Sequence, residues 1–270
     1  MSAAAKWRRD LESWVIPQEL LDAVPDSPYG WPANLWRRRT ASARNRQSGF
    51  TLELVIRLLA EGSDPAALLD VGAGTGRVAL PIAAAGWTVT AVERDPGMLE
   101  ALRSEATGKS IDVVEGSWPD VPVGHFTVSL ASHVAYDVVD IGPFLRALTE
   151  HGSTVVLEVT DRHPWVGLGP LYRELHGLDR PDGPTAEDLI AVVEEVTGVA
   201  TSVERWRRPG DLWFESWDEA TAYYGRRLVL PGERWPELTA LLGERLVEKD
   251  GRLVPNGEDR DLVTIWWATG

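Results

Sequence analysis

The sequence predicts an α/β fold with a doubly wound, mostly parallel sheet and additional helical cap segments. The first observation is an apolar run over residues 66–69, followed shortly by three glycines spaced one residue apart. This combination is typical of a buried strand that opens into a tight turn. The second is a helical pattern over residues 77–85 and an apolar strand over residues 87–92, which complete a strand–helix–strand unit. The third is the continued alternation of strands and helices to residue 159, as in parallel sheets.

Two acidic residues flank this unit. Asp70 stands two residues before the first glycine, and Glu93 ends the second strand, at the height where Rossmann-type folds hold a ribose. Glycines let the backbone approach a ligand closely, and a carboxylate accepts hydrogen bonds from the two ribose hydroxyls. The glycine spacing is not that of a dinucleotide fingerprint, because Arg77 occupies the position of the third glycine.

Residues 68–95 resemble motif I of the class I S-adenosylmethionine-dependent methyltransferases, in which an acid precedes G-x-G-x-G and a second acid binds the ribose. The resemblance implies S-adenosyl-L-methionine as the cofactor. In the loop after the third strand, Ser117 stands where many relatives carry aspartate. By this resemblance the cofactor contacts Asp70, Gly72, Ala73, Gly74, Gly76, Glu93, Arg94, Met98, Gly116, Ser117, Trp118 and Ala131.

Apolar patterns predict the remaining strands of the sheet. They fall over residues 111–114, 125–131, 154–159, 201–207 and 261–268. The resemblance implies that the last strand is inserted antiparallel between the fifth and the sixth. The expected sheet therefore has seven strands in the order 3-2-1-4-5-7-6.

Helical patterns predict the flanking and cap elements. Trp7, Leu11 and Trp14 fall on one face of an N-terminal helix, and this stripe is expected to pack on the main domain. Asp95 followed by Pro96 is typical of a helix start. Further helices are expected over residues 42–60, 142–150 and 171–176, from residue 185 onward, and over residues 218–228 and 235–247.

These elements predict four parts of the chain. Residues 1–62 form an N-terminal helical cap and lid, and the Pro- and Gly-rich loop over residues 25–36 is the candidate lid. Residues 63–208 form the Rossmann-like core that binds S-adenosylmethionine. Residues 209–260 form a helical insertion that contributes to the cap, and residues 261–270 supply the last core strand.

Composition limits the partners. The 270 residues carry a formal net charge of −14, which argues against a nucleic-acid partner because phosphates would be repelled. The signature [DN]-P-P-[YFW] of DNA amino-methyltransferases is absent after the fourth strand. The chain has no cysteine, which excludes thiolate metal sites, and no carboxylate spacing indicates a metal. With no signal peptide and no membrane-spanning run, a soluble, cytoplasmic protein without a membrane partner is expected.

Two histidines are candidates for proton transfer, because a hydroxyl or protonated amine acceptor must lose a proton and histidine titrates near neutral pH. His133 directly follows the fourth strand, where the switch-point rule places the chemistry. His163 follows the fifth strand. His133 has a structural alternative, in which it lines or packs beside the cofactor pocket.

Tryptophans in the expected cap segments indicate the acceptor. The 13 tryptophans include Trp31, Trp36, Trp165, Trp213 and Trp217 in these segments, and an aromatic-walled pocket suits a small apolar or aromatic molecule. The sequence therefore predicts a methyltransferase that acts on an O or N atom of such a molecule. Two alternatives stay open: a non-catalytic S-adenosylmethionine-binding regulator or scaffold, and an NAD(P)-dependent oxidoreductase. The identity of the acceptor and the oligomeric state stay open as well.

Overall fold

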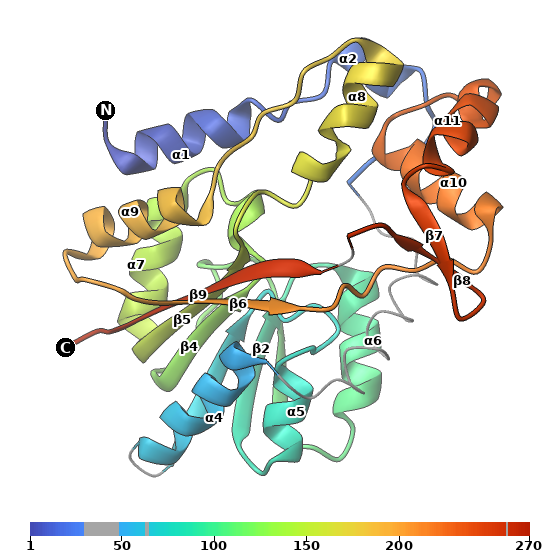
Figure 1. Cartoon of the computed structure of the whole chain (residues 1–270). Coiled ribbons are helices and arrows are strands. Elements are labelled where there is room, and N and C mark those ends of the chain that lie inside the picture. Colours follow the sequence, from blue (N-terminus) through green and yellow to red (C-terminus); the bar gives the residue numbers. More distant parts are fainter. Residues whose placement is uncertain (30–48, 63–64, 258) are drawn as a thin grey trace.

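A seven-stranded sheet forms the centre of the protein (Figure 1). The computed structural model describes residues 1–29, 49–62, 65–257 and 259–270. The strand order is β3-β2-β1-β4-β5-β9-β6, which confirms the predicted fold class and topology. The strands are β1 Ala67–Val71, β2 Thr88–Glu93, β3 Ile111–Glu115, β4 Phe126–Ser132, β5 Gly152–Thr160, β6 Ser202–Arg208 and β9 Arg260–Ala268.

The strand β9 is the antiparallel member of the sheet. It pairs with β5 on one side and with β6 on the other, and Ile265 lies opposite Leu157 and Val203. The other neighbouring strands in the sheet pair in parallel. The carboxyl ends of β1, β2, β4 and β5 therefore meet at one edge, where open α/β sheets bind their ligands.

Helices cover both faces of the sheet (Figure 1). Their apolar sides bury two clusters that contain Leu145 and Leu189 on one face and Leu54 and Ile82 on the other. One face carries α1 Ala3–Glu12, α7 Ile141–His151 and α9 Ala186–Thr197; the other carries α4 Phe50–Glu61, α5 Ala79–Ala84 and α6 Pro96–Ala106.

The N-terminal helix α1 packs on the main domain, as its aromatic stripe predicts. The Trp7 indole donates to the Val138 carbonyl at 2.9 Å, and the Trp14 indole donates to the Gly183 carbonyl at 2.6 Å. The carboxylate of Glu195, on α9, accepts from the first backbone N–H groups of α1. These bonds satisfy donors that a helix start leaves unpaired.

A third apolar cluster forms the core of a cap above the carboxyl edge (Figure 1). It joins segments that lie far apart in the chain, and Ile16, Tyr172 and Phe214 represent three of them. The helices of the cap are α2 Gln18–Asp22, α8 Gly169–His176, α10 Trp217–Arg227 and α11 Trp235–Leu242. Elsewhere in the chain as well as in the cap there are short 3-10 helices, which are η1 Ala135–Asp137, η2 Val166–Leu168 and η3 Gly232–Arg234. The expected domain boundaries remain a proposal, and this cluster crosses them, because α8 lies within residues 63–208.

The prediction of one helix over residues 235–247 is wrong at its end. The helix α11 stops at Leu242, and a hairpin of β7 Leu246–Lys249 and β8 Arg252–Pro255 follows. The turn between the strands is Asp250–Gly251, with φ of 52° and 71°. Asp-Gly in this conformation matches the right-handed twist of two antiparallel strands, so the pair fixes a hairpin where the apolar pattern alone favoured a helix.

Part of the expected lid lies outside the described residues, together with Trp31 and Trp36. In the ranges that the structure describes, no helix combines the length and the apolarity that crossing a bilayer requires.

Candidate active site

The glycine turn after β1 adopts a conformation that requires glycine. The backbone φ angles of Gly72, Gly74 and Gly76 are 68°, 58° and 86°. Residues with a Cβ rarely adopt such positive values. A Cβ on Gly72 would lie 2.4 Å from a methyl group of Val134. The Gly72 and Ala73 N–H groups donate to the Val92 carbonyl at 2.8 and 3.0 Å. The turn is therefore held against the end of β2, next to Glu93.

Glu93 is buried at the end of β2 and binds the glycine turn directly. Its Oε2 accepts from the Gly74 N–H at 2.8 Å, and its Oε1 accepts from the N–H groups of Arg94 and Asp95, each at 2.8 Å. A carboxylate offers about four acceptor directions, so one remains on Oε2. One ribose hydroxyl fits this direction, whereas the second hydroxyl would replace a backbone donor.

Asp70, the first acid of the motif, points to the helix that follows the turn. Its Oδ2 accepts from the Ala79 N–H at 3.2 Å, in the first turn of α5. Burial raises the pKa of this carboxyl to about 7, and the nearby Arg77 charge only partly offsets the effect. In this structure Asp70 acts as a helix cap behind the turn.

The other expected cofactor residues lie along the same edge of the sheet. Arg94 and Met98 follow β2, and the Met98 N–H donates to the Asp95 side chain that caps α6. Ala131 is buried on β4, opposite Val71. After β3, the Gly116 N–H donates to the Glu93 carbonyl at 2.9 Å and Ser117 is exposed. The indole of Trp118 donates to the Phe144 carbonyl at 3.2 Å and thus packs against α7.

His133 directly follows β4 in a strained backbone conformation. Its φ is 60°, in the left-handed region that few residues other than glycine adopt. Its N–H donates to the Glu158 carbonyl at 2.8 Å, and its Nε2 lies 3.1 Å from Glu158 Oε1. Burial lowers its pKa, although Glu158 opposes the shift. The imidazole is therefore neutral near pH 7. Strained residues of this kind cluster at functional sites.

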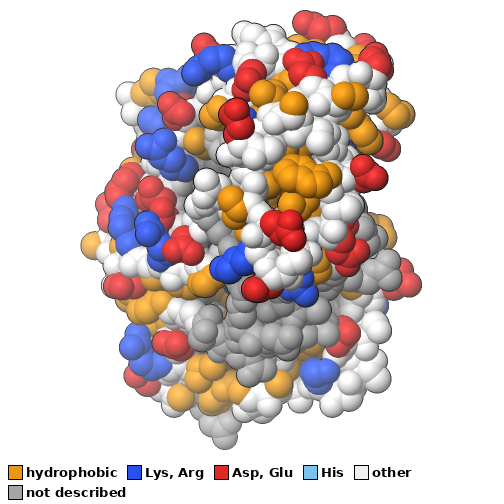
Figure 2. Space-filling view, turned by 45° about the vertical axis from the view of Figure 1, so that its right-hand side comes forward, with side chains coloured by type: hydrophobic (Ala, Val, Ile, Leu, Met, Phe, Trp, Pro, Cys, Tyr) orange, Lys and Arg blue, Asp and Glu red, His pale blue; other side chains and the backbone are white. Residues whose placement is uncertain are grey.

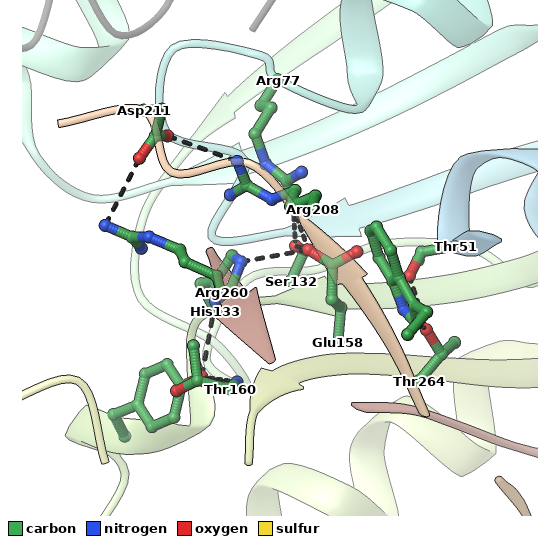
Figure 3. Close-up of polar contacts among 12 residues, drawn as sticks. Thr51, Arg77, Ser132, His133, Glu158, Thr160, Arg208, Asp211, Arg260 and Thr264 are labelled. Atoms are coloured by element: carbon green, nitrogen blue, oxygen red, sulfur yellow. Dashed lines mark hydrogen bonds and ion pairs between the residues drawn. The ribbon is translucent and has the colours of Figure 1, made fainter. Parts of the chain in front are cut away.

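An arginine and a buried glutamate complete the surroundings of His133 (Figure 3). Arg77 donates to Glu158 Oε1 and, at 2.5 Å, to Ser132 Oγ, whose hydroxyl donates to the same Oε1 at 3.0 Å. Burial disfavours the charge on Glu158, but Arg77 and His133 outweigh it and hold the pKa of the carboxyl well below its usual range. We call Arg77, Ser132, His133 and Glu158 the buried array.

Arg77 and Glu158 were not predicted as site residues, although two signals were present. Glu158 interrupts an apolar strand, and its side chain is only 1 % exposed. An isolated charge in such a strand requires a partner. Arg77 follows the last glycine of the turn, and its position at the start of α5 brings it to the ends of β4 and β5.

A second charged group lies beside the buried array (Figure 3). Asp211 forms ion pairs with Arg208 and Arg260, with N–O distances of 3.6 and 3.3 Å. These residues come from the end of β6, the loop after it and the start of β9. In the described part of the chain, no group of three or more His, Asp or Glu residues could hold a metal ion.

His163 lies near the array but packs among aromatic rings. It stacks on Trp14 with ring centroids 4.3 Å apart and meets Tyr136 edge-on at 5.8 Å. Its Nδ1 accepts from the Trp165 N–H at 3.3 Å. Burial, together with the charge of Arg180, lowers its pKa to about 4. These contacts are those of a packing residue.

Aromatic rings of the cap gather near the same edge. Tyr29 stacks on Trp165, with ring centroids 5.6 Å apart, and the Arg227 guanidinium lies 5.3 Å from the Trp165 ring and 5.6 Å from that of Tyr223. The other two described tryptophans of the expected pocket lie elsewhere. Trp213 stacks with Arg252 of the hairpin, and Trp217 is 40 % exposed.

The residues present fit an adenosyl cofactor. Glu93 keeps one acceptor direction beside the glycine turn, and the turn places its backbone at the ligand-binding edge of the sheet. The carboxylate would hold a ribose hydroxyl, and the turn would lie against the aminoacyl part.

Comparison with known proteins agrees with this geometry. The sequence profile described as "Methyltransferase domain" matches residues 69–151, from β1 through α7. The search of curated proteins finds no match.

Solved structures share the fold at low sequence identity. A candidate methyltransferase from an antibiotic biosynthesis pathway of Anabaena variabilis is 15 % identical, with a TM-score of 0.53, and the alignment covers 80 % of this chain and 95 % of that chain. A candidate methyltransferase from Bacillus halodurans is also 15 % identical, with a TM-score of 0.51 and coverage of 82 % and 99 %. The YcgJ protein of Bacillus subtilis is 15 % identical, with a TM-score of 0.51, and the alignment covers 80 % of this chain and 95 % of that chain.

The profile match covers the glycine turn, Glu93 and β4. The chain therefore contains a methyltransferase domain, matched over residues 69–151.

Proposed function

We propose that the enzyme methylates an O or N atom of a small apolar or aromatic molecule, with His133 as the proton acceptor. One observation carries this proposal: a neutral, strained histidine stands at the carboxyl end of β4, between the glycine turn and the aromatic cap. No other described histidine combines this position with a carboxylate partner.

The chain's own contribution is to orient the acceptor and to remove its proton. The bound cofactor supplies an electrophilic methyl group. Orientation and the exclusion of water are worth roughly 7–11 kcal/mol in favourable cases. His133 would take the proton that a hydroxyl or protonated amine loses as its new bond to carbon forms.

The cap supports an aromatic acceptor. Trp165 and Tyr223 present ring faces near Arg227, and Tyr29 adds a stacked ring. Flat apolar molecules bind such surfaces by stacking. A small-molecule acceptor also agrees with the charge of the protein. On the face in Figure 2, acidic and basic side chains are interspersed, in contrast to the basic stripe of a nucleic-acid surface.

Two measurements test the proposal. Calorimetric titration is expected to show binding of S-adenosylmethionine and none of NADPH. Transfer of a labelled methyl group is then measured on a panel of phenols, aromatic amines and aliphatic controls. We expect the labelled methyl group to be transferred to phenols or aromatic amines and not to the aliphatic controls. Cofactor binding without transfer to a whole metabolite extract would favour the non-catalytic alternative, and transfer to nucleic acid would contradict the proposed acceptor class.

A further inference from the structure

We propose that Glu158 is a positioning residue that holds the His133 imidazole in the tautomer with its proton on Nε2 and leaves Nδ1 as the proton-accepting atom. The catalytic part of this inference rests on the proposed function. The tautomer itself does not, because it follows from the contacts on the two sides of the ring.

On the Nε2 side, the ring faces a group that can only accept. Nε2 lies 3.1 Å from Glu158 Oε1, an ion-pair contact, and it is closed to solvent and has no hydrogen-bond partner of standard geometry. An ionised carboxylate has no proton to give. If Nε2 were unprotonated, two lone pairs would face each other at this distance in a buried place. A proton on Nε2 removes this repulsion.

On the Nδ1 side, the neighbouring hydroxyl has already used its proton. Thr160 Oγ1 donates to the Arg162 carbonyl at 2.5 Å, so the Tyr136 hydroxyl must be the donor in its 2.8 Å contact with Thr160 Oγ1. Tyr136 also accepts from the Thr160 N–H. His133 Nδ1 lies 3.4 Å from this hydroxyl, beyond the usual range of hydrogen-bond distances, so a proton on Nδ1 would gain only a weak bond there.

Accessibility agrees with this assignment. The His133 side chain is 23 % exposed, whereas its Nε2 is enclosed. The exposed part therefore belongs to other atoms of the side chain. A proton taken from an acceptor cannot reach Nε2 directly.

Three charged groups and one neutral phenol surround this ring. Glu158 on β5 stabilises a proton on the imidazole, whereas Arg77 before α5 and Arg260 on β9 oppose a second one, and the neutral Tyr136 lies on η1. Because Arg77 also keeps Glu158 ionised, it preserves the acceptor that Nε2 needs. The pair thus fixes the tautomer without charging the ring.

The proton transfer balances with these groups. The acceptor oxygen or nitrogen forms a bond to the methyl carbon, the bond from carbon to the cofactor sulfur breaks, and the sulfur keeps that electron pair. The acceptor's proton moves to Nδ1, which converts the neutral imidazole to an imidazolium. Glu158 stabilises this cation through Nε2–H, as the aspartate of a hydrolase triad does for its histidine.

Nitrogen-15 NMR of the histidine rings tests the tautomer directly. The chain has five histidines, and loss of one signal in H133N assigns the ring. In the wild-type protein at pH 7.5 we expect Nε2–H. A ring with its proton on Nδ1 would overturn the proposal without any further variant.

Three variants separate the contacts. In the double variant R77M/E158M, which replaces the buried ion pair by apolar side chains of similar length, we expect the proton to move to Nδ1. In E158Q the amide oxygen remains held by Arg77, so we expect Nε2–H to persist. Y136F is expected to retain it as well, and a change of tautomer in Y136F would show that Tyr136 holds the ring instead.

Turnover distinguishes this inference from the proposed function. R77M/E158M is expected to lower kcat by about 10²-fold or more, the range for a positioned base, and E158Q by less. The exposed Glu115, which lies opposite Glu93 at the end of β3, provides the control E115Q with wild-type kcat. A shifted tautomer with unchanged kcat would remove His133 as the base and leave the positioning role intact. An unshifted tautomer in R77M/E158M would remove the positioning role.

Discussion

Ionisable side chains inside this protein differ in what compensates for their burial. Glu158 has Arg77, whereas Asp70 has one weak backbone donor and His163 has aromatic neighbours. The pKa values of Asp70 and His163 therefore shift toward the neutral forms. Each shift makes the stability depend on pH, in opposite directions.

Replacing Asp70 by asparagine is expected to remove a loss of stability at high pH. Folded Asp70 has a pKa of about 7, above its usual 3.8, so the folded state binds more protons between these values and wild-type stability falls as pH rises through them. The free energy of unfolding of D70N relative to wild type should therefore increase from pH 4 to pH 7, by at most about 1.4 kcal/mol per pH unit. Urea unfolding at several pH values measures it; a constant difference would contradict the shift.

Replacing His163 by phenylalanine is expected to act at acid pH. The folded pKa of about 4 lies below the usual 6.5, so the unfolded state binds more protons in this window and wild-type stability falls as pH drops from 6.5 to 4. H163F removes that loss. At pH 8 it costs about 1 kcal/mol, because the Trp165 N–H loses its acceptor. Unfolding and turnover are measured together; loss of methyl transfer with unchanged stability would make His163 catalytic.

Removing the Glu93 carboxylate is expected to weaken S-adenosylmethionine binding by about 1.5–3 kcal/mol, the range for hydrogen bonds to a charged group. E93A also leaves the backbone N–H groups of Gly74, Arg94 and Asp95 without their acceptor, so its stability should fall as well. Calorimetry of the folded variant gives the affinity. E115A, which removes an exposed carboxylate from the next strand end, serves as the control. Equal affinities would contradict the ribose assignment.

The part of the site that could be predicted consists of residues that lie close together in the sequence. The glycine turn and Glu93 lie within one strand–helix–strand unit, so their spacing indicates their contact. Arg77 and Glu158 are 81 residues apart, and the pairing of β1 with β4 and of β4 with β5 brings them together. The strained φ of His133 likewise depends on its backbone bond to β5, which no local pattern encodes.

Among the elements, strands and caps with a local signal were predicted well. Asp95 caps α6, and Thr185 forms a capping box with Asp188 at the start of α9. The hairpin of β7 and β8 was missed because its strands have four residues each, too few for an alternating pattern to stand out from the preceding helix. Its Asp-Gly turn was the available signal.

The docking of α1 depends on single indole hydrogen bonds, and this can be measured. Trp7 is 2 % exposed, and its N–H satisfies the Val138 carbonyl. W7F keeps most of the apolar contact but leaves that carbonyl without a donor, and we expect a loss of about 1–3 kcal/mol in the free energy of unfolding. The exposed Trp217 provides the control W217F, which should change stability by at most about 0.5 kcal/mol. Equal effects of both variants would contradict the role of the indole bond.

At the scale of the whole molecule, the sheet was predictable and the cap was not. The sheet follows from strand patterns and one resemblance. The cap core joins the segment around Ile16, the helix α8 and the segment from Phe214 to the hairpin, and each of these alone has too little apolar surface to indicate its partner. Arg227, which donates to the Pro28 carbonyl at 3.0 Å, links the last segment to the first.

Removing β9 is expected to prevent β6 from joining the sheet. A chain without residues 260–270 loses every partner of β6 and one edge of β5. Unpaired strand edges promote aggregation, so the truncated protein should appear in the insoluble fraction on expression. Removal of Gly270 alone leaves all strand pairs and serves as the control. A soluble, protease-resistant truncated protein would contradict the prediction.

The place of β9 also has a consequence for synthesis. A ribosome makes β5 and β6 more than fifty residues before it makes β9, the strand that must enter between them. While the chain grows, β1 to β5 can pair, but β6 has no neighbouring strand and the outer edge of β5 stays unpaired. Because the Glu158 side chain lies on that edge strand, the last strand to be translated also closes the surroundings of His133.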